Sequence, residues 1–89
     1  MIVETDKGFQ KDVSRINDHK VKLQIFELIE HLEDVDGITS IANIKKLSGH
    51  KDLYRIRMGN YRIGIIHINV KTLRLVRFLH RKDIYKKWP

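Results

Sequence analysis

Five arginines recur at regular spacing in the second half of the chain, within segments that alternate apolar and polar residues as a β-strand does. They are Arg55, Arg57, Arg62, Arg77 and Arg81. Residues two apart on a strand point to the same face of a sheet, so the spacing predicts that these five side chains share one face. Guanidinium groups gathered on one surface bind phosphate and other anions. The sequence therefore predicts a concentrated anion site.

A two-residue turn fixes how the first two of these strands pair. The Gly-Asn pair at 59–60 is typical of a type II′ hairpin turn, in which glycine comes first. This turn places Arg57 opposite Arg62 and Arg55 opposite Gly64. Like charges directly opposed across a sheet destabilise it by up to about 1 kcal/mol, so the pairing of Arg57 with Arg62 favours an anion between them. Gly64 has no side chain, and we expect it to leave space for that ligand.

The next hairpin is expected to turn at residues 69–72, which pairs Ile65 with Val76 and Gly64 with Arg77. Val76 then lies with Ile65 on the apolar face of the sheet, and Arg77 lies on the arginine face. The alternative interpretation of the whole set is that the arginines cover a solvated face and form ion pairs with nearby carboxylates or with an acidic helix.

Charge is divided unevenly between the two halves of this 89-residue chain, whose formal net charge is +7. Residues 1–43 hold five Lys and Arg against nine Asp and Glu, a net charge of −4. Residues 44–89 hold thirteen against two, a net charge of +11. A half-chain this basic favours a polyanionic partner, either nucleic acid or an acidic protein segment.

Length and composition limit the classes of protein and site. Residues 1–89 are expected to form a single domain, since a chain of this length has no room for two. The absence of cysteine excludes disulfides, thiolate metal sites and a cysteine nucleophile. The chain opens without the features of a signal peptide, and its apolar runs are too short to span a bilayer. We therefore expect a cytoplasmic domain with no membrane contact, no metal and no cofactor.

The first half of the chain predicts a short strand and two helices. Residues 1–5 are expected to form the strand, after which Phe9, Val13 and Ile16 recur at helical spacing. The second helix carries an apolar stripe made of Val21, Ile25, Leu28, Ile29 and Leu32. Two helices joined by a tight turn form a hairpin with one apolar side. The predicted fold is therefore α+β, with the N-terminal strand and the helical hairpin packed on one face of a small, mainly antiparallel, twisted sheet.

Two other segments give weaker patterns. Residues 36–43 are expected to form a loop, and residues 44–47 a turn of helix or a bend. Leu23 and Phe26 lie off the apolar stripe of the second helix, and we expect them to pack against the first helix. The alternative is that they form an exposed patch.

The order of four short segments after the helical hairpin resembles the RelE/ParE toxin superfamily of type II toxin-antitoxin systems. The segments are KLSG at 46–49, LYRIR at 53–57, GNYRI at 59–63 and HRKDIY at 80–85. The resemblance covers essentially the whole chain and implies a RelE-like fold. It also implies an activity, since toxins of the RelE branch enter the ribosomal A site and cut the messenger RNA there.

The family's functional positions can be matched to individual residues of this chain. The basic pair that contacts RNA phosphates in RelE-like toxins matches Arg55 and Arg57, although the best-known member has lysines there. The arginine after the turn aromatic matches Arg62, and the arginine near the end of the last strand matches Arg81. The C-terminal tyrosine matches Tyr85. The resemblance thus implies that these residues bind and cut RNA.

Cleavage of RNA by its own 2′-hydroxyl requires a base, cations that stabilise the charge on phosphorus, and an acid for the leaving 5′-oxygen. Arginine can clamp phosphate but does not exchange protons at accessible pH. The candidates for proton transfer are therefore Tyr85, whose ionised form neighbouring cations would stabilise, and His80. His80 falls on the helix side if the strand runs straight, where it would instead form a structural contact with Tyr61.

Further basic and aromatic residues surround these positions. Lys46 and Lys82 are expected to contact RNA phosphates. Tyr85 and Trp88 lie among basic residues, a mixture typical of surfaces on which single-stranded RNA stacks. The alternative is that Trp88 belongs to an exposed C-terminal tail.

The resemblance leaves three functional classes open. The first is a ribosome-dependent endoribonuclease, which Arg62, Arg81 and Tyr85 together favour. The second is a ParE-like toxin that inhibits DNA gyrase by binding, without nuclease activity, and the third is an inactive relative that only binds an antitoxin. The partners implied are mRNA on the 70S ribosome and a cognate acidic antitoxin, bound at the arginine face as a helix or an added strand.

Overall fold

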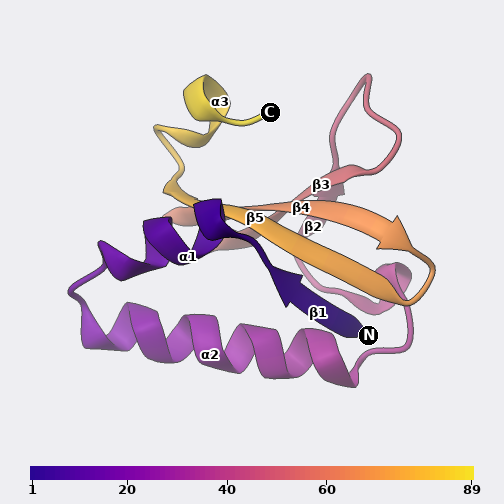
Figure 1. Ribbon diagram of the computed structural model, residues 1–89, viewed down its shortest axis with the longest axis horizontal. Coiled ribbons are helices and arrows are strands. Elements are labelled where there is room, and N and C mark those ends of the chain that lie inside the picture. The colour runs from indigo at the N-terminus through magenta and orange to yellow at the C-terminus, as the bar shows by residue number, and fades with distance from the viewer.

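A five-stranded sheet with helices on both sides forms the structure, a computed structural model that describes residues 1–89 (Figure 1). Along the chain the elements are β1 (Ile2–Thr5), α1 (Lys7–Ser14), α2 (His19–Asp34), a 3-10 helix (Ile38–Ser40), β2 (Ile44–Lys46), β3 (Leu53–Met58), β4 (Tyr61–Asn69), β5 (Thr72–His80) and α3 (Ile84–Lys87). The strand order is β1-β5-β4-β3-β2, with β1 parallel to β5 and every other pair antiparallel. The predicted α+β class and the mainly antiparallel sheet are confirmed.

Aspartate side chains begin both helices of the N-terminal hairpin. Asp6 Oδ1 accepts a hydrogen bond from Phe9 N at 3.0 Å, and Asp18 Oδ1 accepts one from Lys20 N at 2.9 Å. Each carboxylate satisfies a backbone N–H group that has no partner within the first turn of its helix. Asp6 thus begins α1, and Asp18, in the tight turn that follows α1, begins α2, which gives the predicted helical hairpin.

The core lies between this hairpin and one face of the sheet. Figure 1 shows α2 along one side of the sheet and α3 on the other. The fully buried side chains include Leu32 of α2 together with Ile56 and Ile63 of β3 and β4. Phe9 of α1 meets Phe78 of β5 edge to face, with ring centroids 6.3 Å apart. Full burial of such a side chain contributes about 1.5–3 kcal/mol, so these contacts hold the hairpin on the sheet.

The N-terminus is tied to the end of α2. The amino group of Met1 donates hydrogen bonds to the carbonyl oxygens of Leu32, Glu33 and Val35 at 3.1, 2.9 and 2.7 Å. A positive charge is favourable there because the last carbonyl groups of a helix have no partner within it. This connection brings β1 between α2 and the edge of β5.

The first arginine hairpin has the predicted register. Gly59 has φ of +58°, in the left-handed region that glycine adopts without strain. β3 and β4 pair so that Arg57 lies opposite Arg62 and Arg55 lies opposite Gly64. Two consecutive strands therefore place three arginines on the sheet face away from the core.

The second hairpin departs from the predicted register. Gly64 pairs with Arg77 as expected, but Ile65 pairs with Leu75 rather than with Val76. The register shifts at this point, as in a β-bulge, where one extra residue changes which side chains face the core. Leu75 is fully buried and occupies the core position predicted for Val76. Since both residues are apolar, the alternation of residue types does not distinguish the two registers.

Residues Ile44–Lys46 form an edge strand, where the sequence predicted a turn of helix or a bend. β2 pairs antiparallel with β3 and places Lys45 directly opposite Arg55. The prediction was wrong because three residues are too few to show the alternation that identifies a strand. β2 thereby adds another cation to the arginine face.

The C-terminal segment crosses the sheet face opposite the helical hairpin. Ile84 of α3 is fully buried, and the indole of Trp88 lies directly over Gly64. A Cβ atom at Gly64 would come within 2.8 Å of that ring. Trp88 is therefore not in an exposed tail, and the space predicted over Gly64 for a ligand is occupied by Trp88.

The outer face of α2 differs from prediction at two positions. Leu23 and Phe26 are 53% and 61% exposed instead of packed against α1, so the alternative of an exposed patch holds. None of the helices combines the length and the apolar composition needed to cross a bilayer.

Candidate active site

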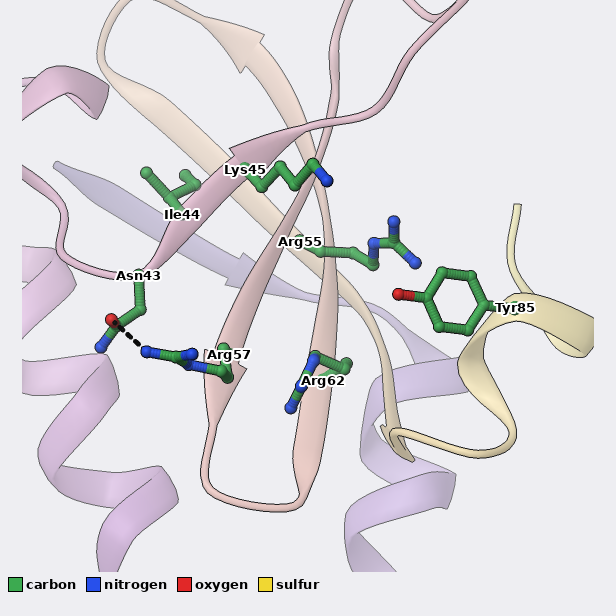
Figure 2. Close-up of a pocket in the computed structure, with 7 residues that line it drawn as sticks. All are labelled: Asn43, Ile44, Lys45, Arg55, Arg57, Arg62 and Tyr85. Carbon is green, nitrogen blue, oxygen red and sulfur yellow. Dashed lines mark hydrogen bonds between the residues drawn. The ribbon is translucent and has the colours of Figure 1, made fainter.

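The arginines of β3 and β4 surround a cavity of about 340 Å³ on the sheet face away from the core (Figure 2). We name it the anion cavity; its lining residues are Asn43, Ile44, Lys45, Arg55, Arg57, Arg62 and Tyr85. Four of them carry positive charge and none is Asp or Glu. The two ion pairs of the protein involve other arginines, so these four cations have no carboxylate partner. Such a concentration of one charge sign attracts anions.

Arg62 is held in place by the β3–β4 turn. Its Nη1 donates hydrogen bonds to the carbonyl oxygens of Gly59 at 3.0 Å and Tyr61 at 2.9 Å. No other hydrogen bond within the protein engages this guanidinium, so its remaining N–H groups are available to a ligand. The turn thus orients Arg62 before an anion binds.

Arg57 is oriented by Asn43, a residue that was not predicted to belong to the site. Arg57 Nη2 donates to Asn43 Oδ1 at 3.3 Å, and Arg57 N donates to Asn43 O at 3.0 Å. Asn43 has φ of +60°, a conformation that asparagine tolerates better than other residues with a side chain. An asparagine just before a basic segment was the one signal in the sequence for this position.

Arg55 and Tyr85 form a stacked pair at the edge of the anion cavity. Arg55 Cζ lies 4.4 Å from the centroid of the Tyr85 ring, a cation–π contact. Figure 2 shows the hydroxyl end of Tyr85 directed from α3 toward Arg55. Tyr85 is 71% exposed, and no protein group forms a hydrogen bond with its hydroxyl. A free phenol therefore lies beside the guanidinium groups of the cavity.

Comparison with known proteins gives the family. The model of the family described as the ParE toxin of the type II toxin-antitoxin system parDE matches residues 3–85. Toxin RelE3 of Methanocaldococcus jannaschii is 39% identical over 84 residues, which cover 93% of each chain. This chain belongs to the RelE/ParE superfamily. It is the toxin of a type II toxin-antitoxin system.

Solved structures of RelE toxins have the same architecture as this toxin. The toxin in a RelB-RelE antitoxin-toxin complex from Methanococcus jannaschii has a TM-score of 0.79 and 36% identity, over 97% of this chain and 99% of that one. A doubly substituted E. coli toxin RelE, in complex with a peptide of the antitoxin RelBc, has a TM-score of 0.61 and 22% identity, over 97% and 90% of the two chains. The second likeness concerns the fold alone.

Arg77 does not join the anion cavity of the toxin, contrary to the prediction. Its Nε and Nη2 donate to the two carboxylate oxygens of Asp12 at 2.8 and 3.2 Å, and Phe78 N donates to the same carboxylate at 2.9 Å. Asp12 is 6% exposed. The hydrogen bond to Asp12 raises the pKa of Arg77 above its ordinary value. Asp12 therefore joins α1 to the edge of β5, and Arg77 belongs to that connection.

Arg81 and His80 also lie outside the anion cavity. Arg81 N donates to Asn60 O at 2.8 Å, which places this residue beside the β3–β4 turn with its side chain exposed. His80 meets Tyr61 edge to face at 5.8 Å, and its Nδ1 accepts a hydrogen bond from Lys82 N at 3.2 Å. His80 thus makes the structural contact that the strand parity predicted as the alternative to a catalytic role.

The two lysines predicted to contact phosphate have different surroundings from the arginines. Lys46 lies opposite Tyr54, on the other side of β2 from Lys45, and Lys82 lies in the exposed turn before α3. Neither lines the anion cavity. The cations that the fold does bring together are Lys45, Arg55, Arg57 and Arg62.

The cavity can bind a phosphodiester and exchange protons beside it. Guanidinium groups donate pairs of parallel hydrogen bonds to phosphate oxygens, and fixed guanidinium groups also stabilise the extra charge that develops in phosphoryl transfer. Among the lining residues other than the arginines, only Tyr85 and Lys45 have side chains that could take part in proton transfer, through a phenol and an amine. No group of three or more His, Cys, Asp and Glu side chains is placed to hold a metal ion.

Proposed function

We propose that this toxin is a ribosome-dependent endoribonuclease that cuts mRNA in the A site by attack of the ribose 2′-hydroxyl on the adjacent phosphate. The observation that carries the proposal is the stacking of Tyr85 on Arg55 at the edge of a cavity with four unpaired cations. A proton acceptor and a phosphate clamp therefore share one site. The 39% identity with Toxin RelE3 supports the same branch of the superfamily.

Arg62 and Arg57 have the role of the phosphate clamp in this proposal. Their orientations are fixed by the turn carbonyls and by Asn43, and a donor oriented in advance loses little energy to reorganisation during the reaction. Arg55 has two roles, because it faces the cavity and stacks on Tyr85. Its charge would stabilise both the phosphate and an ionised phenol.

Tyr85 is the proposed base that removes the proton of the 2′-hydroxyl. His80, the other candidate, lies away from the cavity with Tyr61 and is not assigned this step. Lys45 is the remaining lining side chain with a transferable proton, and we assign it the protonation of the leaving 5′-oxygen. The bond between phosphorus and that oxygen breaks as the 2′-oxygen bonds to phosphorus, giving a cyclic phosphate and a free 5′-hydroxyl.

A cognate antitoxin is the second proposed partner. The structure from Methanococcus jannaschii is a complex of a RelE toxin with a RelB antitoxin. The matching chain of that complex aligns with 97% of this chain. An acidic antitoxin segment would neutralise the four cations of the anion cavity and exclude mRNA from it. Because the contact is between charges, its affinity should fall steeply with added salt.

Toeprinting of programmed 70S ribosomes tests the proposed activity. The wild-type toxin should cut the A-site codon, and Tyr85→Phe, which keeps the ring over Arg55 but removes the hydroxyl, should cut far more slowly. The second candidate function is that of a ParE-like toxin that inhibits DNA gyrase by binding, and the family model that matches residues 3–85 is named for ParE. Intact messages together with inhibited gyrase supercoiling would establish that candidate and overturn the endoribonuclease.

A further inference from the structure

A second cavity, of about 250 Å³, adjoins the anion cavity. The two share Arg55 and Tyr85, so this stacked pair stands between them. The other walls of the second cavity come from the loop between β2 and β3 and from the end of the chain: Leu47, Ser48, His50, Trp88 and Pro89. Nothing in the proposed cleavage chemistry uses these five residues.

The chemistry of the second cavity differs from that of the anion cavity. Leu47 and Trp88 give it an apolar and aromatic wall, whereas Ser48 and His50 supply polar atoms. The side chains of Ser48 and His50 are exposed and form no hydrogen bond within the protein. Arg55 is the only lining side chain of the second cavity that carries a fixed charge. A flat ligand with hydrogen-bonding edges and no charge of its own matches this combination.

Trp88 is placed against the sheet before any ligand arrives. A Cβ at Gly64 would lie 2.8 to 3.1 Å from three atoms of the indole, so the absence of a side chain at Gly64 is what admits the ring. The backbone N–H of Trp88 also donates to Ile84 O at 2.9 Å, which closes the turn of α3. An aromatic wall fixed in this way retains most of the binding energy of a stacked ligand.

We propose that the second cavity binds the base of the nucleotide joined to the phosphate in the anion cavity, with Trp88 and the Arg55–Tyr85 pair as its walls and His50 and Ser48 reading the base edge. Bases splayed out of single-stranded RNA stack on aromatic rings and on guanidinium planes, and polar side chains bond their edges. The inference rests on the proposed function, because it takes RNA as the anion. It adds a recognition site for one base.

The single tryptophan of the chain makes this site directly measurable. Three probes are compared by the fluorescence of Trp88: a 2′-O-methylated trinucleotide that cannot be cleaved, the same trinucleotide made abasic at each position in turn, and inorganic phosphate. The intact trinucleotide should change the emission and bind about tenfold more tightly than the probe abasic at one particular position. Inorganic phosphate should leave the emission unchanged.

Variants separate the base site from the anion cavity. Binding of a labelled trinucleotide, followed by anisotropy, should lose its dependence on that base in His50→Ala and in Trp88→Leu. It should keep that dependence in the matched control His31→Ala, an exposed residue of α2. A toxin that cuts mRNA on the ribosome but binds intact and abasic probes equally, or binds neither, overturns this inference alone. A toxin that does not cut on the ribosome overturns the proposed function with it.

Discussion

Two sets of arginines on one sheet have opposite surroundings. Arg74 and Arg77 of β5 lie 3.1 and 2.8 Å from the carboxylates of Glu4 and Asp12. The arginines of β3 and β4 contact carbonyl oxygens, an amide oxygen and an aromatic ring, and no carboxylate. The paired set contributes to the fold, and the unpaired set is free to bind a ligand. Counting basic residues does not locate the site; the local absence of acidic residues does.

The strand order explains this division. β5 borders β1 and α1, which come from the half of the chain with a net charge of −4. β3 borders β2, which comes from the half with a net charge of +11. The sheet therefore brings acidic residues to one set of arginines and another basic strand to the other. Segregation of charge along the sequence becomes segregation across the sheet.

The largest effect on stability is expected when the paired set is broken. Asp12→Ala leaves the buried N–H of Phe78 and the partly buried guanidinium of Arg77 without their partner. Removing one member of a buried pair costs about 3 to 5 kcal/mol of the free energy of unfolding, which urea denaturation measures. Glu4→Ala, at the exposed pair with Arg74, is the matched control and should cost at most about 1 kcal/mol. Equal losses of the free energy of unfolding in the two variants would contradict the distinction between the buried pair and the exposed pair.

The effect of Asp12→Ala should not depend on pH through the neutral and mildly alkaline range. The pKa of Arg77 is raised in the folded state by its hydrogen bond to Asp12. The stabilisation from this shift is fully present below the ordinary arginine pKa, and it is lost only as pH rises through the raised value.

The next effect concerns the connection between the unpaired arginines and α3. In Gly64→Ala the new methyl group would lie 2.8 Å from the indole of Trp88, so the indole must move. Such overpacking costs about 1 to 3 kcal/mol, and displacement of α3 would carry Tyr85 away from Arg55 and slow A-site cleavage. Gly37→Ala, where nothing lies within 4 Å of the new Cβ, is the control. Wild-type unfolding and cleavage in Gly64→Ala would show that Trp88 does not position Tyr85.

The smallest expected effect is a change in salt dependence. Arg57→Ala removes one unpaired cation from the anion cavity, whereas Arg74→Ala removes one that already has a carboxylate partner. For single-stranded RNA, loss of one phosphate contact lowers the slope of log affinity against log salt by roughly 0.7. Arg57→Ala should show this decrease and Arg74→Ala should keep the wild-type slope. Identical slopes in both variants would show that the unpaired arginines are no more available to RNA than the arginines that have a carboxylate partner.

Local patterns predicted the part of the fold in which neighbours in sequence are neighbours in space. The Gly-Asn turn and the alternation of residues on either side give the register of Arg57 against Arg62, because that pairing depends on nothing outside the hairpin. Three of the four cations of the cavity follow from this register. Lys45 does not, since it comes from a strand of three residues.

Contacts between distant segments account for the positions that were predicted wrongly. Arg77 has the right parity for the arginine face, but its partner is 65 residues away in α1. One signal pointed to that pair: Asp12 follows Phe9 by three residues, which puts a carboxylate on the buried side of the helix, where it needs a cation. No such signal pointed to the packing of Trp88 on Gly64. A glycine within a strand indicates that another group approaches closely, but it does not identify that group.

The decisive measurement for the role of the unpaired arginines is the rate at which Arg62→Ala cuts the A-site codon of programmed ribosomes. Arg62 is oriented by two turn carbonyls and has no acidic partner, whereas the matched control Arg74→Ala removes an arginine already paired with Glu4. Loss of one oriented donor to a reacting phosphate should lower the rate by about 10²- to 10³-fold. We expect this loss for Arg62→Ala and wild-type cleavage by Arg74→Ala. Wild-type cleavage by Arg62→Ala would show that the unpaired arginines do not act on the reacting phosphate.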